Sequence, residues 1–490
     1  MSPMSRASIV FFGVVCVIIH ATDGGCARSP AIYSGAQVWR VIAKDAFNMT
    51  QLENLRKELS AKVVHHTKAG YDLVVGLGML EHAKKLLAYL KLDYKVLIDD
   101  LAQKIKTYNP KITPEDMKLQ EEQGYNFTFK YFHSLEDMHE YLDHLSTTYK
   151  DFVSTQVIGK SIEGRDLKVL TISSGDPAAP DFWIDAGIHA REWIAPTTAI
   201  YIARELVERR ETLPEALKKI NFYILPVVNP DGYEFSRSRD SHRLWRKNRN
   251  PNNRREKTQC YGVDLNRNFD MEWGVSGSSD NPCADVFKGR SPNSELETQA
   301  VTNFVSEIPR IKASVSLHSY SNLILYPFGY AGGRYHSNHE ELHRVGVAVA
   351  QRIKALSGNN YGVQSSGDWY VASGDSSDWA ASRGISYVFT MELSDCDNMP
   401  DGSCFILPPS KIIPIGKEGF ELIKATAEAI LGPPHPKIAM TPQEDSITTS
   451  GSFVTRRSEN CKSPYRLVKC FTLGHHVIII AGFPLPLNKL

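Results

Sequence analysis

Hydrophobic residues along the chain alternate between strand-like and helix-like spacing, and this alternation separates two folded regions. In the first region, residues 28–118, five segments have the spacing of strands (38–42, 71–75, 94–98) or of helices (49–63, 79–90). Strands and helices that alternate over about 90 residues predict a small open α/β sandwich. Residues 101–123 are polar and contain Pro110 and Pro114, so we expect a helix that leads into an exposed linker.

The second region, residues 119–432, has longer apolar segments. Strands are expected at 167–172, 181–185, 222–228, 313–317 and 387–392, and helices at 197–209, 294–306, 342–355 and 416–431. Continuous apolar strands separated by helices predict a mainly parallel sheet that is covered on both faces. Ligands of such sheets bind beyond the carboxyl ends of the strands, so polar residues at those ends are the candidates for chemistry.

The two ends of the chain differ from these regions. Arg6 precedes an apolar run at 9–19 that is followed by small residues, which is typical of a secretory signal peptide over residues 1–27. A membrane anchor is the alternative, but the run is shorter than the roughly 20 residues that span a bilayer. Residues 433–490 begin with prolines, continue with Thr and Ser, and are expected to be mostly disordered. A cleaved lipid-anchor signal at the very end is disfavoured because His475 and His476 interrupt the apolar stretch.

The charge balance and the cysteines of the chain limit which classes of function are possible. The chain has 56 Lys and Arg against 55 Asp and Glu, so nothing indicates a nucleic-acid partner, which would require a basic patch. Two cysteines, Cys16 and Cys26, fall in the signal segment, and the other six form local pairs: Cys260 with Cys283, Cys396 with Cys404, and Cys461 with Cys470. In a secreted chain these pairs are read as disulfides, with free buried thiols as the alternative.

The strongest chemical signal is a histidine and a glutamate three residues apart, His189 and Glu192, directly after the strand 182–185. Such a pair can face one metal ion, and His318, also at a strand end, is the best candidate for a third ligand. Two histidines and one glutamate leave the fourth position of a tetrahedral zinc open, which is typical of a catalytic site. Alone, a His-x-x-Glu pattern occurs by chance on helix surfaces, so its meaning depends on what accompanies it.

Four further motifs follow in order: LPVVNPDGY at 225–233, RLWRK at 243–247, VDLNRN at 263–268 and FTMEL at 389–393. With them the sequence resembles the zinc metallocarboxypeptidases of the pancreatic A/B type, peptidase family M14, in precursor form, over about residues 28–432. The resemblance implies a mixed, mainly parallel sheet between helices, an activation pro-domain at 28–118 and a catalytic domain at 119–432. It also implies a secreted monomeric zymogen with one Zn²⁺, activated by a trypsin-like protease and acting on peptide and protein C-termini, without nucleic-acid or membrane partners.

The resemblance also assigns roles to single residues. His189, Glu192 and His318 would hold the zinc, and Asp264 would accept a hydrogen bond from the His189 imidazole. Glu392 would be the general base, and Arg246 would stabilise the oxyanion. Arg267 would bind the terminal carboxylate through paired hydrogen bonds. The remaining substrate contacts and the disulfide fall on Arg191, Arg243, Asn266, Tyr320, Tyr370 on a mobile loop, Ser377, Phe405, and Cys260 with Cys283.

Specificity is the least determined property. In the resembled family an aspartate at the base of the pocket favours terminal Lys or Arg, and an aliphatic residue favours apolar ends. Ser377 occupies that position and is neither. Together with the other expected pocket residues, Leu325, Gly329, Ala372 and Thr390, it predicts a preference for neutral terminal residues. The alternative is that Asp375 points inward and gives a B-type preference for Lys and Arg.

Two other classes of function compete with a peptidase. A catalytically inactive relative that only binds peptides would usually lack a metal ligand or the base, and this chain keeps His189, Glu192, His318 and Glu392. A hydrolase of small amides would not need Arg267 and Tyr370. Lys111 and Lys118 are the expected points of activating cleavage between the two regions.

Overall fold

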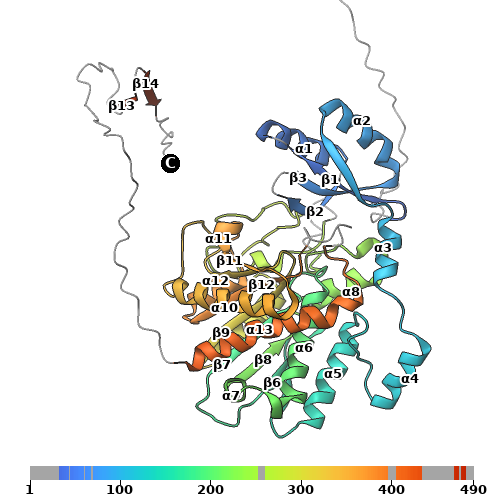
Figure 1. The fold of residues 1–490 in the computed structure, drawn as a ribbon, viewed down its shortest axis with the longest axis vertical. Coiled ribbons are helices and arrows are strands. Elements are labelled where there is room, and N and C mark those ends of the chain that lie inside the picture. The colour runs from blue at the N-terminus through green and yellow to red at the C-terminus, as the bar shows by residue number, and fades with distance from the viewer. Residues whose placement is uncertain are drawn as a thin grey trace, which may run out of the picture. The chain divides into compact units, whose positions relative to one another are not determined.

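The structure is a computed structural model that describes residues 33–43, 45–59, 61–67, 70–251, 260–395 and 404–432, and the strands at 468–473 and 476–481 (Figure 1). The predicted signal peptide, Cys16, Cys26, Cys396 and Cys461 lie outside the described residues.

The N-terminal region is a four-stranded antiparallel sheet with helices packed on it. Its elements are β1 (Gln37–Ile42), α1 (Ala46–Glu58), β2 (Lys62–Thr67), β3 (Gly70–Val75), η1 (Leu77–Met79), α2 (Leu80–Leu90), β4 (Asp93–Ile98) and α3 (Leu101–Tyr108). The strand order is β2-β3-β1-β4. Trp39, Leu52 and Leu87 belong to one buried cluster that joins β1 to α1 and α2. The predicted open α/β sandwich is therefore confirmed.

One local expectation in this region was wrong, and another was right only for its first part. The helix expected over 49–63 ends at Glu58, and the next residues form β2, an edge strand in which Val63 pairs with Leu73 of β3. Two factors outweigh the helical spacing of hydrophobic residues there. The segment pairs with β3, and the β-branched side chains of Val63 and Val64 favour a strand. The helix expected to start at Leu101 ends at Tyr108, and a separate helix, α4 (Pro114–Gln123), follows. Proline disfavours helical backbone before it, which accounts for the break.

The larger region contains an eight-stranded sheet with helices on both faces. Its strands are β5 (Val153–Lys160), β6 (Asp166–Ile172), β7 (Asp181–Ala186), β8 (Asn221–Leu225), β9 (Ile311–Ser319), β10 (Leu323–Tyr326), β11 (Gly362–Ser365) and β12 (Tyr387–Leu393). Its helices are α5 (Leu135–Thr148), α6 (Ile194–Glu208), α7 (Glu215–Lys218), α8 (Pro230–Ser238), α9 (Leu296–Glu307), α10 (His339–Ser357), α11 (Ser366–Trp369), α12 (Ser376–Ser382) and α13 (Ile412–Leu431). Short 3₁₀ turns lie at η2 (Arg210–Thr212), η3 (Asp240–His242), η4 (Leu265–Arg267) and η5 (Pro409–Lys411).

The sheet is mixed, with a parallel centre. The order is β11-β10-β12-β9-β7-β8-β6-β5, and the four central strands β12, β9, β7 and β8 run parallel. One buried cluster joins the sheet to α5, α6, α10 and α13, and a second joins its other face to α9 and α12. Apolar residues on both sides explain why the strands read as continuous apolar runs. The predicted mixed, mainly parallel sheet between helices is confirmed.

The C-terminal segment forms a separate compact unit from Pro434. Within it, β13 (Val468–Leu473) and β14 (His476–Ala481) pair as an antiparallel hairpin. The sequence analysis expected mostly disorder here, and the hairpin includes the apolar run at 477–480, whose β-branched residues favour strands.

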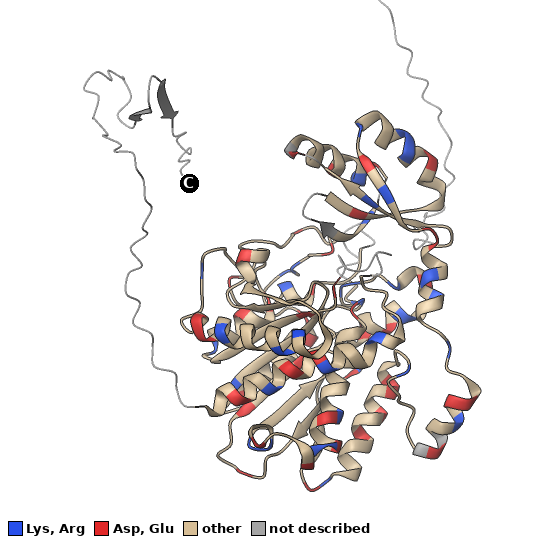
Figure 2. Cartoon of the chain, in the orientation of Figure 1, with Lys and Arg blue, Asp and Glu red and all other residues tan. Residues whose placement is uncertain are grey.

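Charge is spread without a dominant sign. Basic and acidic residues are interspersed along the described helices and loops (Figure 2). Among the described helices none combines the length and apolar content that crossing a bilayer requires.

Candidate functional site

The candidate site lies where the parallel strands end. His318 is the eighth residue of β9, and its register partner on the neighbouring parallel strand β12 is Glu392. On the other side of β9, strand β7 ends at Ala186, and the chain turns at Gly187 with a φ of +64°. A Cβ on Gly187 would lie 3.0 Å from the carbonyl oxygen of Pro226, so only glycine fits this turn easily. The turn leads directly to His189 and Glu192.

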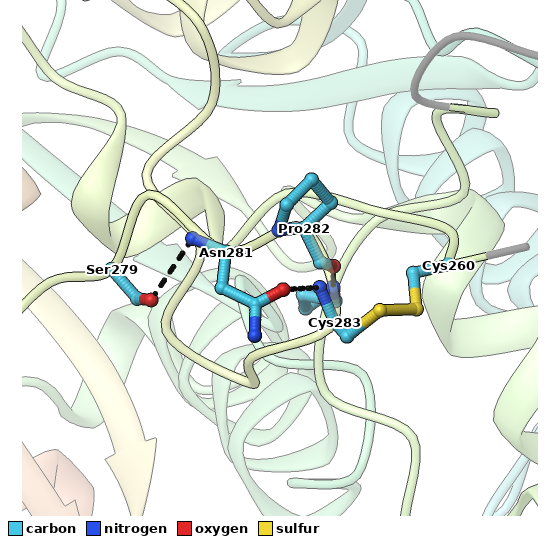
Figure 3. The surroundings of a disulfide bond; sticks show 6 residues. Cys260, Ser279, Asn281, Pro282 and Cys283 are labelled. Atoms are coloured by element: carbon cyan, nitrogen blue, oxygen red, sulfur yellow. Dashed lines mark hydrogen bonds between the residues drawn. A yellow bond between two sulfur atoms is a disulfide. The ribbon is translucent and has the colours of Figure 1, made fainter. Parts of the chain in front are cut away.

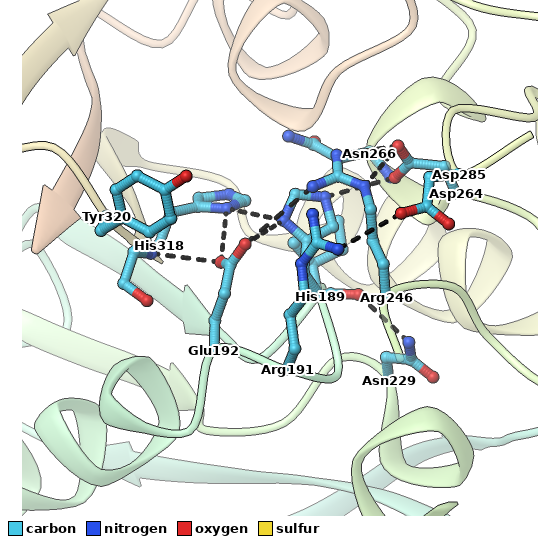
Figure 4. Close-up of polar contacts among 12 residues, drawn as sticks. His189, Arg191, Glu192, Asn229, Arg246, Asp264, Asn266, Asp285, His318 and Tyr320 are labelled. Atoms are coloured by element: carbon cyan, nitrogen blue, oxygen red, sulfur yellow. Dashed lines mark hydrogen bonds and ion pairs between the residues drawn. The ribbon is translucent and has the colours of Figure 1, made fainter. Parts of the chain in front are cut away.

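Three buried side chains converge at this edge of the sheet (Figure 4). His189 Nδ1 lies 2.8 Å from Glu192 Oε1, and His318 Nδ1 lies 3.2 Å from Glu192 Oε2. The two Nδ1 atoms lie 3.2 Å apart. Among the described residues, these three form the cluster of metal-binding side chains, with ligand atoms within 4.8 Å of one another.

The donor set fits a catalytic zinc ion. Two imidazole nitrogens and a carboxylate are the three protein ligands of many such sites. The two Nδ1 atoms face each other at hydrogen-bond distance, and His318 Nε2 is buried without a partner among the described residues, so His318 is poorly satisfied by protein groups alone. A cation held between these atoms would give both imidazole nitrogens an acceptor for their lone pairs.

Asp264 and Arg246 support the cluster from behind. Asp264 Oδ1 lies 3.2 Å from His189 Nε2, which fixes the tautomer that leaves Nδ1 free for a metal. Arg246 donates to Asp264 Oδ2 from Nε at 3.0 Å and from Nη2 at 2.8 Å. Although burial opposes its ionisation, Arg246 and His189 hold the pKa of Asp264 well below its ordinary value. The third nitrogen of Arg246, Nη1, lies 4.0 Å from Glu192 Oε1 and so faces the cluster.

Glu392 is a carboxylate without a hydrogen bond among the described residues, half-buried beside the cluster. Burial raises its pKa to about 8; Glu192 adds to the rise and His318 opposes it. A carboxyl group with its pKa near neutrality is suited to exchange protons with a reacting group.

Arg267 and Asn266 lie on η4 with donors still unused. Arg267 Nε donates to the Gly277 carbonyl at 2.9 Å and Nη1 to the Asn266 carbonyl at 2.7 Å. These bonds fix the guanidinium, while Nη2 makes no hydrogen bond within the described part of the chain. The Asn266 side chain accepts from the Ser376 amide at 2.9 Å, which leaves its own NH₂ group free. Two orientated donors therefore remain for an anionic ligand.

The other predicted substrate residues have more varied positions. Tyr370 follows α11 and is half-exposed. Arg191 packs its guanidinium on the Phe405 ring at 4.4 Å and pairs with Asp285 at 3.2 Å. Arg243 is only 2% exposed and donates to the backbone carbonyls of Arg191 and Phe405. It therefore lies beneath the surface that Arg191 and Phe405 form, and its expected contact with substrate stays a prediction.

Tyr320 contacts the N-terminal region. Its hydroxyl donates to the Val64 carbonyl at 2.6 Å and lies 2.9 Å from His65 Nδ1. Lys62 of the same strand, β2, donates to the Leu244 carbonyl and lies 3.8 Å from Asp285. Asp285 and this part of β2 were not predicted, because contacts between distant segments leave no periodic signal in a single sequence.

The predicted disulfide between Cys260 and Cys283 is present, with a Cα–Cα distance of 5.1 Å (Figure 3). The Asn281 side chain accepts from the Cys283 amide at 3.0 Å and shapes the loop that also carries Asp285. Cys404 is disulfide-bonded too.

Comparison with known proteins agrees with this arrangement. Residues 138–422 match the family described as zinc carboxypeptidase, peptidase M14. The chain is 36% identical over 439 residues to carboxypeptidase A4 of Mus musculus, covering 86% of this chain and 98% of the relative. The chain belongs to the zinc carboxypeptidase family. This zinc carboxypeptidase is therefore a hydrolase, as the sequence analysis predicted.

Three further comparisons agree with membership of this family. It is 37% identical over 302 residues to carboxypeptidase B of Astacus astacus, covering 61% of this chain and 97% of the relative. The crystal structure of thrombin activatable fibrinolysis inhibitor has a TM-score of 0.72 at 30% identity and covers 81% of this chain and 98% of that chain. The crystal structure of carboxypeptidase A from Helicoverpa armigera has a TM-score of 0.68 at 29% identity and covers 82% of this chain and 99% of that chain.

Proposed function

We propose that this chain is a secreted zymogen of a zinc-dependent exopeptidase that hydrolyses the last peptide bond of peptides. The observation that carries the proposal is the placement of a buried His-Glu-His cluster, a free carboxylate and an arginine with unused donors around one edge of the sheet. Metal, proton transfer and recognition of a terminal carboxylate are the three requirements of this reaction.

His189, Glu192 and His318 would hold the metal. When bound there, zinc supplies a Lewis acid and makes water acidic at near-neutral pH. Glu392 would take a proton from the attacking water and later deliver it to the leaving amine. Arg246, orientated by Asp264, would donate a hydrogen bond from Nη1 to the oxyanion as charge develops.

Arg267 and Asn266 would select the C-terminus, because a guanidinium and an amide bind a carboxylate through charge-assisted hydrogen bonds. Tyr370, which is half-exposed, would close over the bound residue. The test compares hydrolysis of a peptide that has a free C-terminal carboxylate with hydrolysis of its C-terminal amide. We expect cleavage of the free acid only; equal rates would point to a hydrolase of small amides or to an endopeptidase.

We propose that the N-terminal region inhibits the enzyme before processing. Strand β2 covers the hydroxyl of Tyr320, a predicted substrate residue, through Val64 and His65. Apolar residues of both regions, including Val64, Ile98, Leu244 and Phe405, share one buried cluster. Removing this region would expose Tyr320 and Phe405 to substrate.

Activating cleavage would fall at Lys111 or Lys118. Lys111 lies in the exposed coil between α3 and α4, whereas Lys118 lies inside α4. Asp116 of that helix bonds Tyr131 at 2.6 Å and Lys130 at 2.7 Å. Because proteases cut exposed loops more readily than docked helices, we expect cleavage at Lys111 first. N-terminal sequencing after treatment with a trypsin-like protease tests this expectation.

The predicted preference for neutral terminal residues rests on Ser377. Its hydroxyl is buried and lies 2.5 Å from Thr390 Oγ1. A pocket that offers these two hydroxyls would favour neutral side chains, whereas an inward-pointing Asp375 would give the B-type preference that the sequence left open as the alternative.

A further inference from the structure

We propose that Asn126 carries an N-linked oligosaccharide, which stays on the enzyme after the N-terminal region has been cleaved off. Asn126 begins an Asn-Phe-Thr triplet, 126–128, in the coil between α4 and α5. Such a triplet is the acceptor for N-glycosylation of secreted proteins. The inference therefore rests on the secretion that is part of the proposed function, and it concerns a surface that takes no part in catalysis.

The triplet is folded with its Asn outward and its Phe inward. Phe127 is 3% exposed, and its ring stacks on that of Tyr141 in α5 with the centroids 5.0 Å apart. The Thr128 amide donates to His133 Nε2 at 3.1 Å, which fixes the backbone on the C-terminal side of Phe127. Asn126 itself is exposed. A bulky polar group on Asn126 would consequently extend into solvent while the residues beside it stay packed.

The Asn126 side chain can take up a sugar without losing its hydrogen bond. Nδ2 donates to Glu140 Oε2 at 3.1 Å and carries two hydrogens. In the transfer, a bond forms between Nδ2 and the anomeric carbon of an N-acetylglucosamine, and the bond from that carbon to a lipid-linked pyrophosphate breaks. The pyrophosphate leaves with the electron pair, and Nδ2 gives one proton to a base of the transferase. The second hydrogen remains available for Glu140.

The other triplet of this kind in the chain, Asn48-Met-Thr, has a different setting. Asn48 is partly buried and lies in the first turn of α1, where the Asp45 side chain accepts from its backbone amide at 2.7 Å. It also belongs to the N-terminal region, so a sugar on it leaves with that region when the chain is cut at Lys111 or Lys118. Asn126 follows both lysines in the sequence. Of the two triplets, the one at Asn126 therefore determines whether the processed enzyme keeps an N-linked sugar.

Asn126 also lies away from the metal cluster. Tyr141, which Phe127 contacts, donates from its hydroxyl to Glu208 Oε1 at 2.7 Å. Glu208 is the last residue of α6, whereas Glu192 comes just before the start of that helix. A helix of 15 residues is about 20 Å long, so the sugar is attached near the end of α6 that is opposite to the cluster. We expect it to leave peptide hydrolysis unchanged.

The test uses the full chain, secreted by cultured eukaryotic cells, collected from the medium and cut with a trypsin-like protease. The mass of the processed enzyme is measured before and after treatment with a peptide N-glycosidase, which releases the sugar and converts the linked asparagine to aspartate. We expect the mass to fall by that of a single oligosaccharide. Sequencing of fragments should then show aspartate in place of Asn126.

Two variants at Thr128 provide the matched control. Thr128→Val removes the hydroxyl that the triplet requires and keeps the shape of the side chain, so the processed enzyme should have no sugar to release. Thr128→Ser keeps the hydroxyl, which accepts from the Lys130 amide at 3.3 Å in the wild type, and should keep the sugar. Both variants should hydrolyse a free-acid peptide as the wild type does. Should Thr128→Val not fold, Asn126→Gln removes the acceptor nitrogen and leaves Thr128 in place.

The outcomes separate this inference from the proposed function. A processed enzyme from the medium whose mass does not change with the glycosidase overturns the inference alone, and so does an equal loss of mass in Thr128→Val or Asn126→Gln. If the wild-type chain stays in the cytosol of the expressing cells, the proposed secretion fails and the inference fails with it. A chain that is glycosylated at Asn126 but cleaves no peptide would support the inference and contradict the peptidase activity.

Discussion

The candidate metal-ligand cluster and the proposed pocket for the terminal side chain meet on one strand but are built in different ways. Glu392 and Thr390 are two positions apart on β12 and therefore lie on the same face of the sheet. Around Glu392, strand ends in fixed register bring His318 and His189 together. Thr390 contacts Ser377 at the capped start of α12, where a loop meets a short helix. We therefore expect the strand ends to fix the chemistry, and the loop-to-helix junction to leave the choice of substrate open to single substitutions.

The largest expected effect is on the metal cluster. Glu192→Ala removes one of three protein ligands and also the carboxylate that both histidines contact. We expect loss of bound zinc and peptidase activity at the background level. Zinc content and turnover are measured on the same sample, and a metal-free variant with full activity would exclude this ligand assignment.

The next effect separates proton transfer from metal binding. Glu392→Gln has nearly the same shape but cannot take up a proton, so we expect normal zinc content with turnover lowered about 10²- to 10⁴-fold. Near-normal turnover would mean that another group acts as the base. The pocket should be unaffected, so the residual activity should keep the wild-type preference among terminal residues.

A smaller effect is expected where β2 covers Tyr320. The Tyr320 hydroxyl gives its hydrogen to Val64, so His65 Nδ1 donates to it. His65→Ala removes this hydrogen bond. Its contribution of about 0.5–1.5 kcal/mol to the contact between the two regions corresponds to a roughly two- to tenfold rise in activity of the unprocessed chain. His82→Ala is the matched control, because His82 bonds Glu58 within the N-terminal region. Equal activity in both variants would argue against inhibition through this contact.

The sequence predicted the cluster better than the pocket, for physical reasons. His189 and Glu192 are close in the chain and His318 ends an apolar strand, so spacing and periodicity indicate their positions. Glu392 was identified by the family resemblance. Asp375 lies in a glycine-containing loop, where neither helical nor strand periodicity applies. Its neighbours include Gly329, which is distant in the chain and which only tertiary packing brings to Asp375 and Asp378. Asp285 and Lys62 were missed because their contact joins distant segments. The start of the edge strand β2 was read as helix because pairing with the neighbouring strand, more than its own residues, determines its conformation.

Metal dependence of exopeptidase activity is the most direct test of the central claim. The protease-treated full chain is freed of metal with a chelator, and release of the C-terminal amino acid from a free-acid peptide is followed as zinc is added back. The account predicts no release without metal, recovery that is complete at one zinc per chain, and no release from the amidated peptide at any zinc level. Undiminished release by the metal-free chain would contradict it.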